Sequence, residues 1–208
     1  MVEAYFYVPA NLAEDAIECG IKLSKWYSRE VELGGEIKKC ISALLNPRDD
    51  YNKYISTEYR CLKLEVQPKY CFVADSLLYE AGRSNSCVME LYQRSIIPIE
   101  QYTFGKYRLP ECLITSTVIG EQINLLSKRL DTPVLYDNSQ ELYFSNIIEC
   151  FRDEHENFND TILYHLLKRL CQDGKVDNVE DEASGLAVFN DNRTGQVYTL
   201  RIPDMDSY

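Results

Sequence analysis

The sequence predicts a protein of the α+β class, in which helices and strands are mixed without strict alternation. Three observations lead to this class. Residues 61–66 alternate apolar and charged side chains with the period of a half-buried strand. Residues 139–151 and 160–172 repeat apolar side chains with helical spacing. Residues 186–189 and 196–202 flank a polar turn and predict a β-hairpin.

The composition fits one substantial core with an acidic end. Of the 208 residues, 45% are hydrophobic and 26% are charged. The net charge of −11 is divided as −3 for residues 1–50, +1 for 51–133 and −9 for 134–208. We expect a single domain (1–208) with a core (1–133) and an acidic helical and hairpin extension (134–208). The acidic balance argues against non-specific duplex binding, which needs several cations, but allows a local site in the middle segment.

The sequence also predicts a soluble, cytoplasmic protein. No run approaches the ~18 to 20 apolar residues that cross a bilayer, and the first residues lack the basic and then apolar layout of a signal peptide. The eight cysteines are widely spread without a Cys-x-x-Cys pair, and the chain has two histidines. We therefore expect free thiols, no metal site and no membrane partner.

The N-terminal part is expected to form a strand, a helix and a second extended segment. Residues 3–9 are aromatic and β-branched, and Pro9 ends them. Asn11 is expected to cap a short helix that Gly20 ends, before residues 21–24 become extended. Residues 31–45 then predict a helix, which Pro47 ends. Its apolar face would hold Ile37, Cys40, Ile41, Leu44 and Leu45.

The middle of the chain predicts further strands around a less regular region. Residues 77–108 contain Gly82, Pro98 and Gly105 among scattered basic and aromatic side chains, and we expect a long, partly irregular excursion. The other expected elements are strands at 61–66, 70–74 and 111–118, a helix at 120–130 and a short strand at 134–136.

Three separated segments carry a family resemblance. They are Tyr5-Phe-Tyr-Val-Pro with the later Asn11-Leu and Gly20-Ile-Lys-Leu, then Asn46-Pro-Arg-Asp-Asp-Tyr-Asn-Lys-Tyr54, then Tyr107-Arg-Leu-Pro-Glu-Cys-Leu-Ile114. In this order they resemble ADP-ribosyltransferases, most closely the DarT-type DNA ADP-ribosyltransferase toxins. In that family the corresponding pieces are a first strand with a helix ending in Gly-Leu, an Asn-Pro-Arg-Asn-Pro-Met-Leu-Tyr stretch, and an Arg-x-Ala-Glu-Phe-Leu-Val segment with the catalytic glutamate. The resemblance covers about the first two thirds of the chain.

The resemblance implies an ADP-ribosyltransferase-like mixed β core with flanking helices, and NAD as a substrate. Glu111 and Arg48 would be the catalytic pair, and Tyr7, Arg48 and Tyr54 would line the NAD cleft. Breaking the glycosidic bond of NAD develops positive charge on the ribose, which a carboxylate stabilises while it orients or deprotonates the acceptor. An arginine can fork onto pyrophosphate oxygens and stays charged at any working pH.

Tyr7 departs from the family pattern. It stands where the family's first strand carries a histidine that holds NAD, and Pro9 replaces the usual threonine. A tyrosine hydroxyl can donate to a ribose oxygen, although its geometry differs from that of an imidazole.

The segment before Glu111 is where such transferases read their acceptor. Unpaired bases stack on aromatic rings while cations follow phosphates, so the segment suits single-stranded DNA. In the competing interpretation, its tyrosines cover an edge of the core and its cations are solvated. The expected substrate-binding residues are Arg94, Tyr102, Phe104, Tyr107 and Arg108.

Three hypotheses stay open from the sequence. The first is an ADP-ribosyltransferase that modifies a nucleic-acid base, and a toxin of this kind would imply an antitoxin partner. The second is a non-catalytic module of the same fold that binds a nucleotide or a protein. The third is an unrelated α+β domain, in which Arg48 pairs with Asp49 or Asp50 and Glu111 faces water from a strand end.

Overall fold

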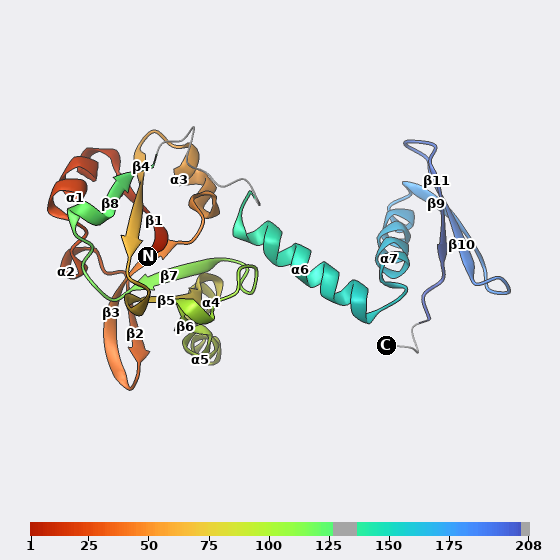
Figure 1. The fold of residues 1–208 in the computed structure, drawn as a ribbon. Coiled ribbons are helices and arrows are strands. Elements are labelled where there is room, and N and C mark those ends of the chain that lie inside the picture. Colours follow the sequence, from red (N-terminus) through yellow and green to blue (C-terminus); the bar gives the residue numbers. More distant parts are fainter. Residues whose placement is uncertain (127–136, 205–208) are drawn as a thin grey trace. The chain divides into compact units, whose positions relative to one another are not determined.

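The computed structural model describes residues 1–126 and 137–204 (Figure 1). Within these ranges the protein contains both helices and sheets, which confirms the α+β prediction. The chain divides into two compact units, Met1–Asn146 and Ile147–Tyr208. The expected boundary between 133 and 134, and the expected strand at 134–136, lie outside the described residues.

An eight-stranded sheet forms the framework of the first unit, in the order β6-β5-β7-β3-β1-β4-β8 with β2 added against β3. The strands that pair directly with one another run antiparallel. Their bounds are β1 Val2–Pro9, β2 Arg29–Leu33, β3 Glu36–Leu44, β4 Tyr59–Val66, β5 Cys71–Asp75, β6 Ile97–Pro98, β7 Pro110–Ile114 and β8 Ile123–Leu125. The expected strands at 3–9, 61–66, 70–74 and the start of 111–118 are confirmed.

The sheet splits between β1 and β3. β1 pairs with β4 along its whole length, from Val2 opposite Val66 to Pro9 opposite Tyr59. Between β1 and β3 the register contains the single pair Tyr5 and Leu44. Two half-sheets, β1-β4-β8 and β3-β7-β5-β6, therefore diverge on either side of this pair.

The alternation of side chains along each strand separates two apolar layers. In β1, Ala4 and Val8 are fully buried in the main core with Leu62 and Leu64 of β4. The intervening positions of β1 face the other side, where Tyr5 joins a smaller cluster. This is the period-two pattern of a sheet covered on both faces.

The predicted helix at 31–45 is wrong, because β2 and β3 form a hairpin there. Gly34 and Gly35 both adopt positive φ, 65° and 84°. Two successive residues of this kind favour a tight hairpin turn, since glycine takes positive φ without a steric penalty. The apolar side chains whose spacing indicated a helix do not share one buried face, since Ile37 is 79% exposed whereas Cys40 is fully buried.

The N-terminal connection is partly as expected. The helix α1 spans Ala13–Cys19, follows the 3-10 turn Ala10–Leu12, and ends at Gly20 with φ 77°. The side chain of Asn11 makes no cap, so that expectation is wrong. Residues 21–24 are not a strand, because Ile21 forms a single bridge to Val118 and the short helix α2, Leu23–Trp26, follows.

The expected irregular region 77–108 contains two helices, α4 (Ser76–Gly82) and α5 (Ser86–Ser95). The Asn85 side chain accepts from two backbone N–H groups of α5, and such a cap starts a helix even where the apolar spacing is weak. The expected helix at 120–130 is also wrong over its described part. A 3-10 turn, Gly120–Gln122, leads there into β8.

The second unit carries the predicted helices and hairpin. The helix α6, Ser139–Glu154, begins in the first unit and continues into the second, and α7 spans Phe158–Gln172. β10 (Leu186–Asp191) and β11 (Val197–Arg201) form the expected hairpin, and β9 (Val176–Asp181) adds a strand that the sequence did not predict. A core around Phe189 and Leu167 joins α7 to this sheet.

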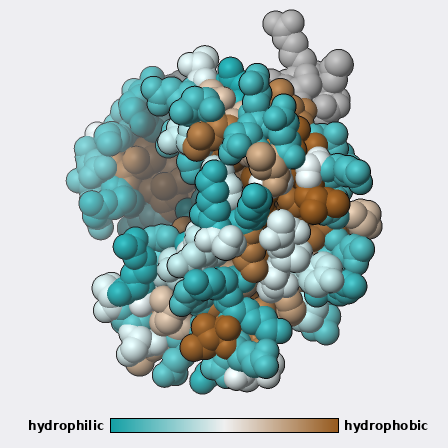
Figure 2. Space-filling view, turned by 90° about the vertical axis from the view of Figure 1, so that its left-hand side faces the viewer, coloured by the Kyte–Doolittle hydropathy of each residue, from teal (hydrophilic) through white to brown (hydrophobic). Residues whose placement is uncertain are grey.

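The remaining loops carry short elements of the first unit. The 3-10 turns Pro47–Asp50, Pro68–Tyr70 and Ile99–Gln101 and the helix α3, Tyr51–Ile55, complete it. Within the described ranges, no helix has the length and apolar character needed to span a bilayer. Figure 2 views the molecule from the left-hand side of Figure 1 and shows hydrophilic side chains over most of this face.

Candidate active site

Glu111 is held inside the first unit by three donors. It lies opposite Leu44 in the register of β7 and β3, and it is 1% exposed. The Ser42 hydroxyl donates to Oε2 of Glu111, and the Tyr92 hydroxyl donates to Oε1 at 2.9 Å. Arg29 supplies the charge, with its Nε 3.2 Å from Oε2. The carboxylate is therefore oriented by two hydroxyls and neutralised by one guanidinium.

Arg29 is itself fixed from a second side. Its guanidinium lies 3.8 Å from the ring centroid of Tyr79 and 3.9 Å from the carboxylate of Glu80. Its side chain is 16% exposed, so solvent screens the pair with Glu111 only weakly. Arginine suits this place because its planar group can stack on an aromatic ring while it donates to a carboxylate.

The interpretation of Glu111 as a strand-end carboxylate facing water is wrong. The sequence reasoning missed Arg29, Ser42 and Tyr92, which come from β2, β3 and α5. One local signal was present, since Ser42 is polar between the buried Ile41 and Ala43. Burial raises the pKa of the Tyr92 hydroxyl, and the neighbouring charge of Glu111 raises it further, so Tyr92 stays a neutral donor.

Tyr7, Arg48 and Tyr54 gather at the end of β3. The Tyr7 hydroxyl donates to the carbonyl oxygen of Pro47 at 2.7 Å. The Arg48 guanidinium lies 5.6 Å from the ring centroid of Tyr54 and forms an ion pair with Asp137. Burial raises the pKa of Tyr7 far above its ordinary value. These three predicted NAD-binding residues are therefore brought together.

The competing interpretation, in which Arg48 pairs with Asp49 or Asp50, is wrong, because Arg48 pairs with Asp137. Asp49 accepts from the backbone N–H and the hydroxyl of Ser139, both at 2.7 Å, and so caps α6. Burial raises the pKa of Asp49 despite these bonds. Asp50 accepts from the backbone N–H of Lys53 at 3.1 Å and caps α3.

Register places Tyr7 and Glu111 on one face of the sheet. Tyr5, Leu44 and Glu111 form a row across β1, β3 and β7, and directly paired residues point to the same side. Tyr7 follows Tyr5 by two positions and shares that side. In this row Leu44 lies between Glu111 and the strand that carries Tyr7. Arg48 follows Leu44 by four residues in the sequence. The three segments thus meet at the split, whereas Glu111 is covered.

The expected substrate-binding residues separate into two groups. Tyr102 and Tyr107 are each 9% exposed and belong to the main core, so neither presents a ring on the outer surface, although Tyr102 lines the cavity described below. Phe104 is 57% exposed. The guanidinium of Arg94 pairs with Glu90, its neighbour on α5, at 4.0 Å, and Arg108 donates from Nε to the side-chain oxygen of Gln140 at 2.9 Å.

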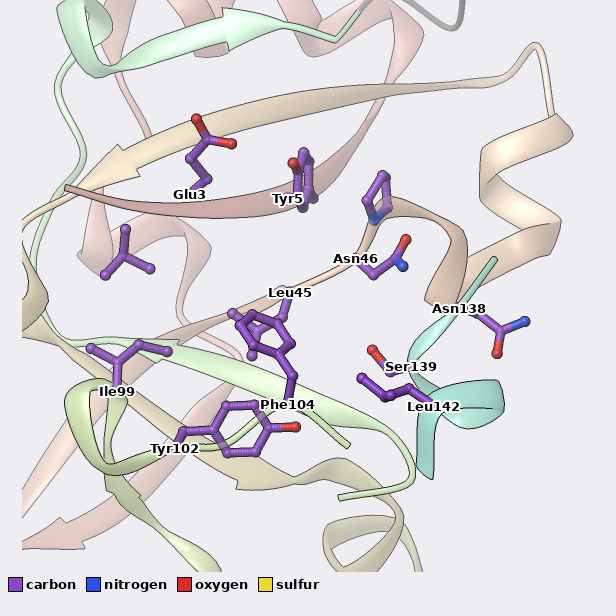
Figure 3. A pocket seen from close by; sticks show the side chains of 12 residues that line it. Glu3, Tyr5, Leu45, Asn46, Ile99, Tyr102, Phe104, Asn138, Ser139 and Leu142 are labelled. Atoms are coloured by element: carbon purple, nitrogen blue, oxygen red, sulfur yellow. The ribbon is translucent and has the colours of Figure 1, made fainter. Parts of the chain in front are cut away.

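A cavity of about 580 Å³ opens at the split, and we call it the split cavity (Figure 3). Predominantly apolar side chains from β1, the end of β3, residues 99–104 and the start of α6 surround it. Tyr7, Arg48, Tyr54 and Glu111 are not among its lining residues. Those residues are Val2, Glu3, Tyr5, Leu45, Asn46, Pro47, Ile99, Tyr102, Phe104, Asn138, Ser139 and Leu142.

The described residues contain no group of three or more histidine, cysteine, aspartate or glutamate side chains placed to hold a metal ion. Comparisons of the chain with known protein families, with curated proteins and with solved structures gave no match.

Proposed function

We propose that the protein is an ADP-ribosyltransferase-like enzyme that uses NAD to modify a base of single-stranded DNA. The observation that carries this proposal is the convergence of the three resembling segments at the split of the sheet. Tyr7 and Pro47 are joined by a hydrogen bond, and Glu111 pairs in register with Leu44, which ends the strand just before Pro47.

The residues present fit such a substrate at two points. The Nε of Arg48 is buried without a hydrogen-bond partner in the described part of the protein, and a pyrophosphate oxygen would satisfy it. The Tyr7 hydroxyl donates to Pro47 and also hydrogen-bonds with the side chain of Cys61, so one lone pair of its oxygen is left to accept from a ribose hydroxyl.

Glu111 would act as the charged group of the reaction. NAD supplies the C1′–nitrogen bond of its ribose, which breaks with the electron pair leaving on nicotinamide. The ionised Glu111 would stabilise the positive charge on that ribose and take the proton that the acceptor nitrogen loses as the new C1′–nitrogen bond forms. Because Arg29 now neutralises the carboxylate, this role requires the side chain of Arg29 to move aside when substrates bind.

A second candidate is a non-catalytic module of the same fold that binds a nucleotide. The burial of Glu111 against Arg29 favours it, since a carboxylate with three donors and 1% exposure has little capacity left for a substrate. If the protein is instead the ADP-ribosyltransferase, we would also expect a neutralising protein partner, by analogy with toxin and antitoxin pairs.

Incubation with NAD labelled in its adenylate part separates the two candidates. The enzyme should transfer label to single-stranded oligonucleotides, and Arg48→Ala should abolish both transfer and the thermal shift by NAD. Arg83→Ala is the matched control, because Arg83 is an exposed arginine on the distant α4–α5 connection with one surface ion pair to Glu80. A thermal shift without transfer or NAD hydrolysis supports the binding module. If NAD gives no label transfer, no hydrolysis and no thermal shift, both candidates are contradicted.

A further inference from the structure

We propose that the split cavity binds an uncharged planar heteroaromatic ring of the nucleobase class. Neither Glu111 nor Tyr7 lines this cavity, so the proposal does not depend on the ADP-ribosyltransferase assignment. Four properties of the cavity lead to this ligand class: its aromatic walls, one unsatisfied hydroxyl, its charges and its fixed shape.

Three aromatic side chains line the cavity. Tyr102 and Phe104 lie 5.6 Å apart between ring centroids, and Tyr5 contributes a third ring from β1 (Figure 3). Phe104 is the exposed member of the group, at 57%. A large aromatic side chain that remains exposed beside an apolar cavity can stack on a flat ring that enters it. The volume of about 580 Å³ lies within the range of small-molecule sites.

The hydroxyl of Tyr102 lacks an acceptor. The side chain is 9% exposed, and its oxygen is buried without a hydrogen-bond partner of good geometry among the described residues. The backbone N–H groups of Gly105 and Tyr107 lie close to this oxygen, and they can only donate. Buried hydroxyls are normally paired. A ring nitrogen or a carbonyl oxygen of the ligand would supply the acceptor.

Two neutral carboxamides, those of Asn46 and Asn138, line the cavity. Asn46 and Asn138 use their side-chain oxygens to accept from the backbone N–H groups of Arg48, at 2.9 Å, and Glu141, at 3.0 Å. Their NH₂ groups remain as donors, and carboxamides pair well with the edges of bases. Among the described residues that line the cavity, the one with a charge is Glu3, which pairs with Lys63 at 2.8 Å. Because this described lining holds no cation, it suits a neutral ring better than a phosphate.

The wall formed by α6 is pinned on two sides. The bonds from Ser139 to Asp49 hold the first turn of the helix. Two turns later, the helix packs so closely on Gly105 that a Cβ there would lie 2.2 Å from Nδ2 of Asn146. The Asn146 side chain also donates to the carbonyl oxygen of Phe104 at 3.5 Å. The cavity is therefore built into the fold, as small-molecule sites usually are.

Calorimetric titration of the full chain with the four deoxyribonucleosides tests the proposal, because these probes carry the ring without phosphate. At least one should bind, and octanoate, an aliphatic probe, should not. Phe104→Ala should weaken binding about tenfold or more, as loss of a stacking ring does. Phe144→Ala is the matched control, since Phe144 is a 42% exposed phenylalanine on α6 that does not line the cavity. Its binding should equal that of the parent protein.

Tyr102→Phe provides the second measurement. It should weaken nucleoside binding about tenfold, because the ligand loses one donor. It should leave the melting temperature unchanged or raised, since the hydroxyl has no acceptor in the free protein. The proposal is overturned if no nucleoside binds at millimolar concentration, if octanoate binds in their place, or if Phe104→Ala binds as the parent does. Loss of NAD binding in Arg48→Ala bears on the proposed function and leaves this result unaffected.

Discussion

The most informative perturbation is removal of the positive charge that neutralises Glu111. In Arg29→Met, the new side chain can keep the apolar contact with Tyr79, but the carboxylate loses its counterion in a place that is 2% exposed. Breaking a buried ion pair by removing one partner costs about 3–5 kcal/mol. The hydroxyls of Ser42 and Tyr92 remain bonded to Glu111, so we expect the lower end, about 3 kcal/mol.

Urea unfolding followed by tryptophan fluorescence measures this loss directly. Trp26 is the single tryptophan of the chain, and its ring lies 5.7 Å from that of Phe6 in the core of the first unit. Its signal therefore reports the unit that contains Glu111. Arg83→Met is the control, because this exposed arginine forms a surface pair whose removal should change stability by about 0.5 kcal/mol or less.

The double variant completes the thermodynamic cycle. Arg29→Met with Glu111→Gln leaves no unpaired charge, so it should recover at least about 1 kcal/mol of the loss expected from adding the single changes. If Arg29→Met is as stable as the parent protein, the side chain of Glu111 is not a buried ionised group. In that event the interpretation of a covered carboxylate would be refuted, and the second functional candidate would lose the observation that favours it.

Three further predictions follow from single contacts. Gly105→Ala should destabilise the first unit by about 2 kcal/mol more than Gly34→Ala in the same fluorescence assay, because both glycines have positive φ but only Gly105 has a neighbour within reach of a Cβ; equal losses would mean that α6 does not pack there. Hydrogen bonds from Arg193 lower the pKa of Asp191 to about 2, so its contribution is present above the ordinary carboxyl pKa of ~4 and is lost as pH falls through 2. An NMR titration of its carboxyl carbon should show a midpoint well below that ordinary value. Arg193→Ala should raise the midpoint part of the way, because the guanidinium is lost while the backbone N–H of residue 193 still donates to Asp191. A thiol reagent near neutral pH should modify the exposed Cys19 and Cys87 quickly and the exposed Cys150 more slowly, because Glu154 raises the pKa of Cys150. Cys40 should react later than these three, because it is buried and burial raises its pKa to about 11. Mass spectrometry of the modified peptides gives the order, and early loss of Cys40 would show that the β2–β3 hairpin opens.

Local patterns in the sequence were sufficient for the strands with clear alternation and for the amphipathic helices. The stretch 61–66 became β4, and the apolar stripes near the C-terminus became α6 and α7. The local patterns gave a wrong prediction at 31–45, where five apolar residues have the spacing of a helix. There the Gly34-Gly35 pair decided for a hairpin, because two successive positive φ angles reverse the chain whatever the periodicity on either side.

The candidate site shows the same division between local and long-range information. The sequence by itself determined the order of the three segments and therefore which residues were worth following: Tyr7, Arg48 and Glu111. Only the tertiary structure decided that Glu111 is covered, because Arg29 and Tyr92 reach it from elements 82 and 19 residues away. Whether a carboxylate faces water or a guanidinium depends on strand pairing, and strand pairing is a property of the whole sheet rather than of any segment.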